Sequence, residues 1–234
     1  MAAVKHFALL PAAGVGSRVG GALPKQYVTL GGRPVLAHTL ERLQSAFAFD
    51  SLFVIVARDD EAVERLIGTR APVEILRCGG ASRSETVANA VSALVDRIHD
   101  DDWMLVHDAV RPCVPADAVR RLVAEIADDD VGGLLALPLA DTLKRGDDAP
   151  APRVAATVNR SRLWRAQTPQ MFRFGILRRA FARPDAAAAT DEAQAVEAIG
   201  YRPRLVTGSA FNIKITYPDD LALASVILTT EALR

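Results

Sequence analysis

Short apolar runs alternate with longer amphipathic segments over the first 140 residues of the chain. The apolar runs have the length and composition of buried strands, which we expect at residues 7–10, 52–56, 73–76, 103–106 and 133–139. The segments between them carry apolar residues at helical spacing and predict helices at residues 35–47, 59–67, 82–94 and 116–126. This alternation predicts an α/β fold with a doubly wound, mostly parallel sheet.

The pattern changes after residue 140. Residues 141–158 are polar and contain a turn-rich stretch, which predicts an extended hairpin that is too polar to bury itself. Beyond it we expect helices at residues 174–181 and 191–199, strands at 204–206 and 212–216, and a closing helix from Pro218. Without a linker or repeat, the chain is expected to be one domain, 1–234, with a β-arm at about 140–160. Because two isolated strands are marginal in water, we expect the arm to pack on a second copy in a homodimer.

Composition limits the kinds of partner. The formal net charge is zero and the pI is near 6.9, so bulk binding to nucleic acid or to a membrane surface has no electrostatic support. The two cysteines and four histidines have no metal-ligand spacing, so we expect no protein-held metal site and a reducing, cytoplasmic location. No stretch approaches the length of a membrane span.

A glycine-rich loop follows the first predicted strand. It contains Gly14 and Gly16, with Arg18 inside it and Lys25 near its end. Glycines let backbone N–H groups face a phosphate, and two cations add fixed positive charge. The dinucleotide fingerprint would need glycine where Val19 stands, and no Gly-Lys-Ser/Thr follows as in a P-loop. An ordinary glycine-rich turn is the alternative, but the interleaved cations favour a site for a polyanion.

Two further loops leave predicted strand ends, one at Gly80 and one at Asp108. Ligands of doubly wound sheets sit at the carboxyl ends of the strands, so these loops and the Gly14 loop should converge. A bare Asp108 carboxylate would repel phosphate unless Mg²⁺ lay between them, directly or through water. The alternative is an aspartate that caps the next turn.

Eight motifs in the same order resemble the 2-C-methyl-D-erythritol 4-phosphate cytidylyltransferases, CTP-using enzymes of non-mevalonate isoprenoid synthesis. They lie at residues 11–18, 24–27, 79–83, 107–112, 141–144, 168–170, 190–192 and 212–216. One departure is Phe211, where members often carry aspartate. The resemblance implies a Rossmann-like nucleotidyltransferase that transfers CMP from CTP to methylerythritol 4-phosphate and releases pyrophosphate.

The implied chemistry suits the residues. A phosphate monoester is mostly ionised at pH 7, because its second pKa is about 6, so the nucleophile needs no general base. The reaction needs neutralisation of charge on the α-phosphate and the leaving pyrophosphate. By resemblance, Arg18 and Lys25 stabilise the transition state, Lys214 positions the substrate phosphate, and Arg160 binds it with a forked guanidinium. Mg²⁺ is expected to bind mainly through the CTP phosphates.

The resemblance also implies a set of substrate-binding residues. For the nucleotide these are Pro11, Ala12, Ala13, Gly14, Gly16, Gly80, Ala81, Thr86 and Asp108. For methylerythritol phosphate they are Thr142, Thr168 and Thr190, with Arg111 as an ion-pair partner that is either structural or in contact with substrate. Thr86 is equally well an ordinary helix residue, and each threonine taken singly has a purely structural alternative.

Two other functions stay open from the sequence. A ribitol 5-phosphate cytidylyltransferase shares much of the loop architecture, but it tends to show Leu-Ala-Gly-Gly where this chain has Pro-Ala-Ala-Gly at 11–14. A nucleotide-binding regulatory module could keep the pocket without turnover. Intact Arg18, Lys25 and Lys214 argue against that second alternative.

Overall fold

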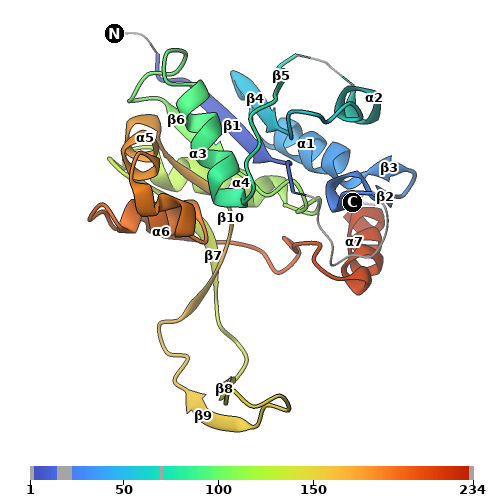
Figure 1. The fold of residues 1–234 in the computed structure, drawn as a ribbon, viewed down its shortest axis with the longest axis vertical. Helices are drawn as coiled ribbons and strands as arrows, with labels where there is room; N and C mark the ends of the chain where they lie inside the picture. The colour runs from blue at the N-terminus through green and yellow to red at the C-terminus, as the bar shows by residue number, and fades with distance from the viewer. Residues whose placement is uncertain (1–2, 15–22, 69–70, 232–234) are drawn as a thin grey trace.

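The computed structural model describes residues 3–14, 23–68 and 71–231. Within them, seven strands form the main sheet in the order β11-β7-β10-β6-β1-β4-β5 (Figure 1). They are β1 (His6–Pro11), β4 (Ser51–Ile55), β5 (Val73–Leu76), β6 (Trp103–Val106), β7 (Gly132–Pro138), β10 (Trp164–Arg173) and β11 (Arg204–Thr207). Only β10 runs antiparallel to its neighbours. The predicted fold class is confirmed.

Helices cover both faces of the sheet, and alternate strand residues point to each. Leu10 and Val54 pack in one core with α1 (Val35–Ala46), α2 (Val63–Ile67) and α4 (Ala116–Ile126). Leu9 and Phe53 pack in the other with α3 (Arg83–Ala93), α5 (Phe174–Phe181) and α6 (Glu192–Glu197). The buried positions of β1, β4 and β6 are therefore all apolar, as expected for strands buried on both faces of a sheet.

The long strand β10 was not predicted. Its sequence contains Gln167, Thr168, Pro169 and Gln170, which do not form an apolar run. The register against β7 shifts between Ala166 and Gln170, so these polar residues sit at an irregularity in the strand. Proline, which cannot donate a ladder hydrogen bond, is tolerated at such a place, and a bulge re-aims side chains toward a site.

The strand predicted at 212–216 is wrong. The segment is irregular, and its backbone groups bond elsewhere: Ile215 N donates to Val110 O at 2.9 Å, and Asn212 O accepts from Arg111 Nη1 at 2.7 Å. The helix predicted at 59–67 is shorter than expected, because Asp60 accepts from the N–H groups of Ala62 and Val63 and so caps α2 there. The closing helix is α7 (Pro218–Glu231).

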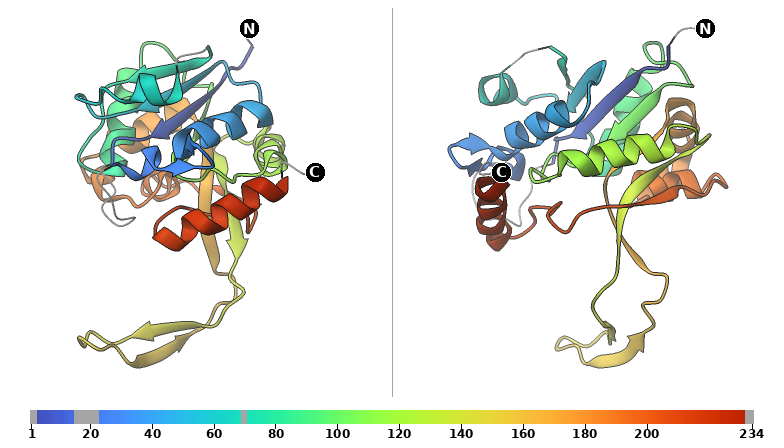
Figure 2. Two further views of the ribbon diagram at one scale, coloured as in Figure 1. Left: turned by 90° about the vertical axis from the view of Figure 1, so that its right-hand side faces the viewer. Right: turned by 180° about the vertical axis from the view of Figure 1, so that it is seen from behind.

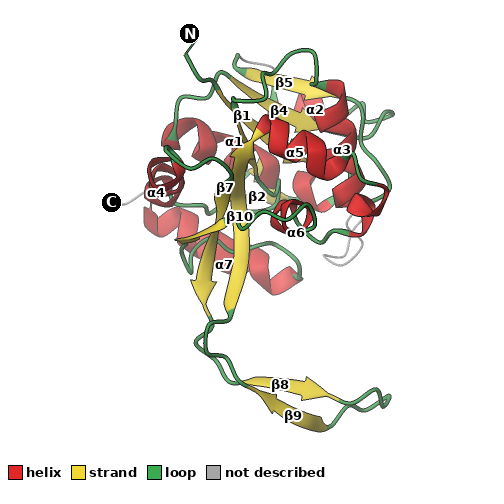
Figure 3. Ribbon diagram, turned by 90° about the vertical axis from the view of Figure 1, so that its left-hand side faces the viewer, coloured by secondary structure: helices red, strands yellow, loops and turns green. Residues whose placement is uncertain are grey.

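The predicted arm is confirmed as a hairpin of β8 (Leu143–Gly146) and β9 (Val154–Val158). It stands away from the body of the molecule, at the far end of the paired strands β7 and β10 (Figures 2 and 3). The shorter elements are the hairpin of β2 (Thr29–Leu30) and β3 (Arg33–Pro34), with the 3₁₀ helices η2 (Lys25–Tyr27) and η3 (Pro184–Ala188). No helix in the described part of the chain is long and apolar enough to cross a membrane.

Candidate active site

The first wall of the site is built by the end of β1 and by η2, which carries Lys25. Gln26, the next residue, donates from Nε2 to Ala12 O at 2.7 Å, and this bond ties η2 to the end of β1. Tyr27 donates its hydroxyl proton to Asp60 Oδ2 at 2.5 Å. The position of the Lys25 backbone is therefore set by two buried neighbours. The predicted site residues Gly16 and Arg18 lie outside the described residues.

The second wall is the loop before α3, which approaches the first loop closely. A Cβ on Gly79 would lie 2.3 Å from Ala13 Cβ and 2.8 Å from Val56 O, so only glycine fits here. Ser82 caps α3, because Glu85 N donates to Ser82 Oγ at 3.0 Å, and the Glu85 carboxylate accepts from Ala81 N at 2.9 Å. The loop before α3 thus packs closely against Ala13, which follows β1, and against the backbone of Val56, which follows β4.

Thr86 lines the site, but its hydroxyl is already engaged by the loop. Its Oγ1 accepts from Gly80 N at 3.0 Å and donates its one proton to Ser82 O at 2.8 Å. The side chain therefore holds the loop around Gly80, and a ligand could reach it only through a remaining acceptor lone pair.

A cavity of about 280 Å³ opens between these loops. Its lining residues come from the three predicted loops and from the segment after β11, so the predicted convergence is confirmed. They include Pro11, Ala12, Ala13, Gly14, Lys25, Gly80, Ala81, Arg83, Thr86, Asp108 and Lys214.

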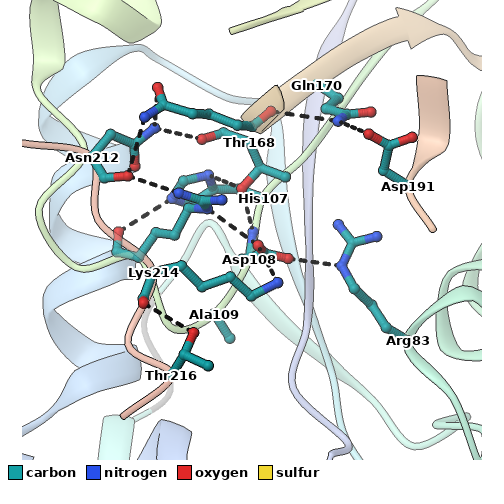
Figure 4. A network of polar contacts seen from close by, with 12 residues as sticks. Arg83, His107, Asp108, Ala109, Thr168, Gln170, Asp191, Asn212, Lys214 and Thr216 are labelled. Atoms are coloured by element: carbon teal, nitrogen blue, oxygen red, sulfur yellow. Dashed lines mark hydrogen bonds and ion pairs between the residues drawn. The ribbon is translucent and has the colours of Figure 1, made fainter. Parts of the chain in front are cut away.

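Asp108 is the hub of the charges in this cavity (Figure 4). Its Oδ1 pairs with Arg83 Nε at 2.7 Å, and its Oδ2 pairs with Lys214 Nζ at 2.9 Å and Arg111 Nε at 3.2 Å. Burial alone would raise the pKa of Asp108, but these three cations hold that pKa well below its usual range. The carboxylate is therefore ionised and is no proton acceptor at neutral pH.

His107 is buried beside Asp108 and is held neutral. Burial lowers the pKa of His107 to about 3, outweighing the neighbouring Asp108 charge that would raise it. Thr168 Oγ1 lies 3.1 Å from Nδ1 and also accepts from Asp108 N at 3.0 Å, while Nε2 lies 3.3 Å from Arg111 O. The geometry assigns a proton on Nε2 and a Thr168 proton donated to Nδ1.

A second cavity of about 140 Å³ adjoins the first one. Arg83, Asp108 and Lys214 line both cavities, and Arg111, Thr168, Thr190 and Asp191 line the smaller one. The α6 end of this cavity is anchored by Gln170, which donates to Asp191 Oδ2 at 2.9 Å and accepts from Ala193 N at 2.8 Å. The two cavities therefore meet at a wall of three charged side chains.

Two predicted residues are not brought into either cavity of their own chain. Thr142 and Arg160 are exposed on the arm, and neither lines the two cavities. Two charged residues without a predicted role are central instead: Arg83, which is partly exposed, and Glu192, which is buried, form an ion pair. Both fall within the motifs that the sequence already singled out, but nothing in the sequence indicated that they meet.

The family model described as 2-C-methyl-D-erythritol 4-phosphate cytidylyltransferase matches residues 6–230. The chain belongs to this family. A cytidylyltransferase of that name from Dechloromonas aromatica is 49% identical over 228 residues, which cover 96% of this chain and 97% of the relative. Another from Laribacter hongkongensis is 53% identical over 222 residues, covering 94% and 95%.

Solved structures agree with this cytidylyltransferase assignment. A crystal structure of a 4-diphosphocytidyl-2C-methyl-D-erythritol synthase matches with a TM-score of 0.86 and 41% identity, covering 97% of this chain and all of that one. The Francisella tularensis cytidylyltransferase matches with a TM-score of 0.80 and 34% identity, covering 95% and 99%. The chain is thus a CTP-using nucleotidyltransferase of isoprenoid biosynthesis.

Proposed function

We propose that the chain transfers CMP from CTP to 2-C-methyl-D-erythritol 4-phosphate, giving 4-diphosphocytidyl-2-C-methyl-D-erythritol and pyrophosphate. The observation that carries this proposal is the pair of adjoining cavities with Arg83, Asp108 and Lys214 as their common wall. Two phosphorylated substrates in neighbouring pockets bring the attacking oxygen and the α-phosphate to that wall, where cations are concentrated.

The larger cavity suits the nucleotide. Its small side chains leave room for a base and ribose, and Lys25 and Gly14, which both line it, would hold the triphosphate. Lys25 would stabilise charge that develops on the transferred and leaving phosphates, and Arg18 is expected to add to it.

The attacking oxygen needs no base from the protein. Asp108 and the adjacent His107 are unsuited as proton acceptors, because Asp108 is paired with three cations and both His107 nitrogens are occupied. A phosphate monoester dianion is already a nucleophile at neutral pH. The proposed work of the site is therefore positioning and neutralisation of charge.

The smaller cavity suits the alcohol phosphate. Thr190 and Asp191 line it together with the cationic side chains of Arg83, Arg111 and Lys214. The Thr168 hydroxyl donates its proton to His107, so its main contribution to this cavity is to hold His107 and the Asp108 backbone in place.

The residues present do not fit a metal ion held by the protein. In the described residues no group of three or more His, Cys, Asp or Glu side chains could hold one. Asp108 Oδ2 already accepts from two cations and Oδ1 from a third, which leaves it little capacity as a ligand. We therefore infer that Mg²⁺ comes with the CTP phosphates, with Asp108 near it at most through water.

The arm suggests a composite site in a homodimer. Thr142 and Arg160 have roles in the resemblance but lie on a hairpin that stands away from the body (Figure 2). If the arm crosses a two-fold axis, the partner subunit's Arg160 enters the smaller cavity and meets the substrate phosphate. The whole chain, with its arm, would then be one nucleotidyltransferase domain. Both cysteines are free thiols, in keeping with a cytoplasmic location.

The testing experiment is a pyrophosphate-release assay with CTP and Mg²⁺. Methylerythritol 4-phosphate, ribitol 5-phosphate and no acceptor are compared in parallel. We expect release only with methylerythritol 4-phosphate. Release with ribitol 5-phosphate alone would assign the other substrate, and CTP binding without release would indicate a regulatory module.

A further inference from the structure

Glu192 is a buried carboxylate with a single charged partner in the ion pairs of the described chain. It is the first residue of α6 and is fully buried. Its Oε1 lies 2.7 Å from Arg83 Nη1 and its Oε2 lies 3.1 Å from Arg83 Nη2, which is a forked pair. Glu192 lines neither cavity, so it does not reach a ligand.

Arg83 connects Glu192 to the wall between the cavities, because it also pairs with Asp108. With its fork occupied by Glu192, the guanidinium presents Nε to Asp108 Oδ1 at 2.7 Å. The other oxygen of Asp108, Oδ2, is then left to Lys214 Nζ at 2.9 Å and Arg111 Nε at 3.2 Å. A chain of alternating charges thus runs from Glu192 through Arg83 and Asp108 to Lys214 (Figure 4 shows its Arg83 to Lys214 part).

We propose that Glu192 is a positioning residue for phosphoryl transfer: by holding the Arg83 fork it keeps Asp108 available to Lys214 at the wall between the two substrate cavities. The inference rests on the proposed function. It adds a residue 109 positions from Arg83 that acts on the reaction without touching either substrate.

The physical argument is a competition for one carboxylate. An arginine fork pairs best with both oxygens of a carboxylate at once. Without Glu192, the Arg83 fork turns to Asp108 and competes with Lys214 for Oδ2. The Lys214 ammonium then loses its anchor, and a misplaced charge at a reacting phosphate costs rate more than binding.

The supports of Glu192 are rigid, which a positioning residue needs. Asp191 caps α6 by accepting from Gln194 N at 2.9 Å, and Gln170 holds the same turn against β10. On the other side, Ser84 of α3 donates to Ala186 O at 2.7 Å and ties α3 to η3. The ion pair therefore joins two helices that are each anchored to the body by further hydrogen bonds.

Removing the charge of Glu192 should change CTP affinity and kcat in different ways. Glu192→Gln keeps the size of the side chain but removes one negative charge near the phosphates. The site becomes more positive, so CTP affinity should be retained or should rise, while kcat should fall by about 10- to 100-fold. Simple damage to the fold would weaken both together. Glu197→Gln, on the exposed side of α6, is the matched control and should change neither.

The experiment measures kcat, both KM values, CTP dissociation by calorimetry and Tm for wild type, Glu192→Gln, Glu192→Asp and Glu197→Gln. Glu192→Asp keeps the charge and should recover part of the lost kcat. In a Lys214→Ala background, Glu192→Gln should change the residual kcat less than about twofold, because the anchored group is gone. Wild-type turnover in the same assay tests the proposed function separately.

A folded Glu192→Gln protein with kcat within twofold of wild type overturns the proposal. So does a parallel loss of kcat, CTP binding and Tm, or an undiminished effect in the Lys214→Ala background. If Glu192→Gln does not fold, Arg83→Lys decides, since it keeps the charge and loses the fork. A tenfold fall in kcat with retained CTP binding then supports the proposal, and a near-normal kcat overturns it.

Discussion

The neutral, buried His107 should make the stability of the protein depend on pH in a defined window. Burial lowers its pKa from the ordinary value of 6.5 to about 3. Between these values the unfolded chain binds a proton that the folded chain does not, so the free energy of unfolding falls as the pH is lowered. This contribution is fully present above pH 6.5 and is lost progressively toward pH 3.

The magnitude follows from the size of the window. A pH of 5 lies about 1.5 units below the pKa of the unfolded imidazole, which is then protonated, while the folded imidazole is still neutral. Each pH unit corresponds to about 1.4 kcal/mol in the free energy of unfolding. His107 should therefore account for a loss of about 2 kcal/mol between pH 7.5 and pH 5. That is a large part of the stability of an ordinary domain.

Urea unfolding at pH 7.5 and pH 5 measures this difference in wild type and in His107→Gln. Glutamine fills a similar space, and its Nε2 can still donate to Arg111 O, but it does not titrate. The variant should lose about 2 kcal/mol less than wild type between the two pH values, whatever its absolute stability. His99→Gln, which removes an exposed imidazole, is the control. Equal pH dependence in wild type and His107→Gln would refute the neutral assignment.

Three further outcomes are expected. Lys25→Ala should lower turnover by about 100-fold or more and weaken CTP binding less, as measured by pyrophosphate release and calorimetry; near-normal turnover in the folded variant removes Lys25 from the mechanism. EDTA should abolish turnover without lowering Tm, since the described residues offer no metal cage, and Mg²⁺ should restore it; activity that survives EDTA contradicts this. Gly79→Ala should lower both Tm and CTP affinity, because its Cβ would meet Ala13 and Val56 O, whereas Gly14→Ala, whose Cβ would have no described residue within 4 Å, should leave Tm unchanged.

The strands that the sequence predicted well are those with uninterrupted apolar runs, such as β1 and β4. They are buried on both faces, and burial leaves a direct trace in the sequence. β10 escapes this rule, because its residues 167–170 are polar or proline and serve the site at a break in the ladder. The segment 212–216 misleads in the opposite way. Its Ile-Lys-Ile alternation is typical of a strand, but Asn212 O accepts from the Arg111 side chain and Ile215 N donates to Val110 O, so these groups do not join a strand ladder.

The site was predictable where its residues are close in sequence and unpredictable where they meet through the fold. Lys25 and Gly80 belong to recognisable loops at strand ends, so their convergence followed from topology. The pairing of Arg83 with Glu192 depends on α3 and α6 packing into the same core on one face of the sheet, which no spacing encodes. The hydrogen bonds of the hydroxyl groups are equally hidden in the sequence. Thr86 donates to Ser82 O and Thr168 to His107 Nδ1, and only the structure shows these partners.

The position of Arg160 leads to the last prediction, about subunit composition. Arg160 is exposed at the base of the arm and lines neither cavity of its own chain. If it acts in trans, each site combines Lys25 of one subunit with the partner subunit's Arg160. Arg160→Ala and Lys25→Ala homodimers are then both inactive, but a heterodimer of the two has one site with both lesions and one with neither.

Mixing equal amounts and allowing subunits to exchange should therefore restore about a quarter of the wild-type activity, because half of the dimers are mixed and each carries one intact site. Native mass measurements of variants with different tags confirm the exchange. Mixing Arg160→Ala with Lys214→Ala should restore activity equally, while mixing Lys25→Ala with Lys214→Ala should not, because Lys25 and Lys214 line the same cavity of one chain and each site of the heterodimer then lacks one of them. Confirmed exchange without recovered activity would place Arg160 within its own chain's chemistry or outside the reaction.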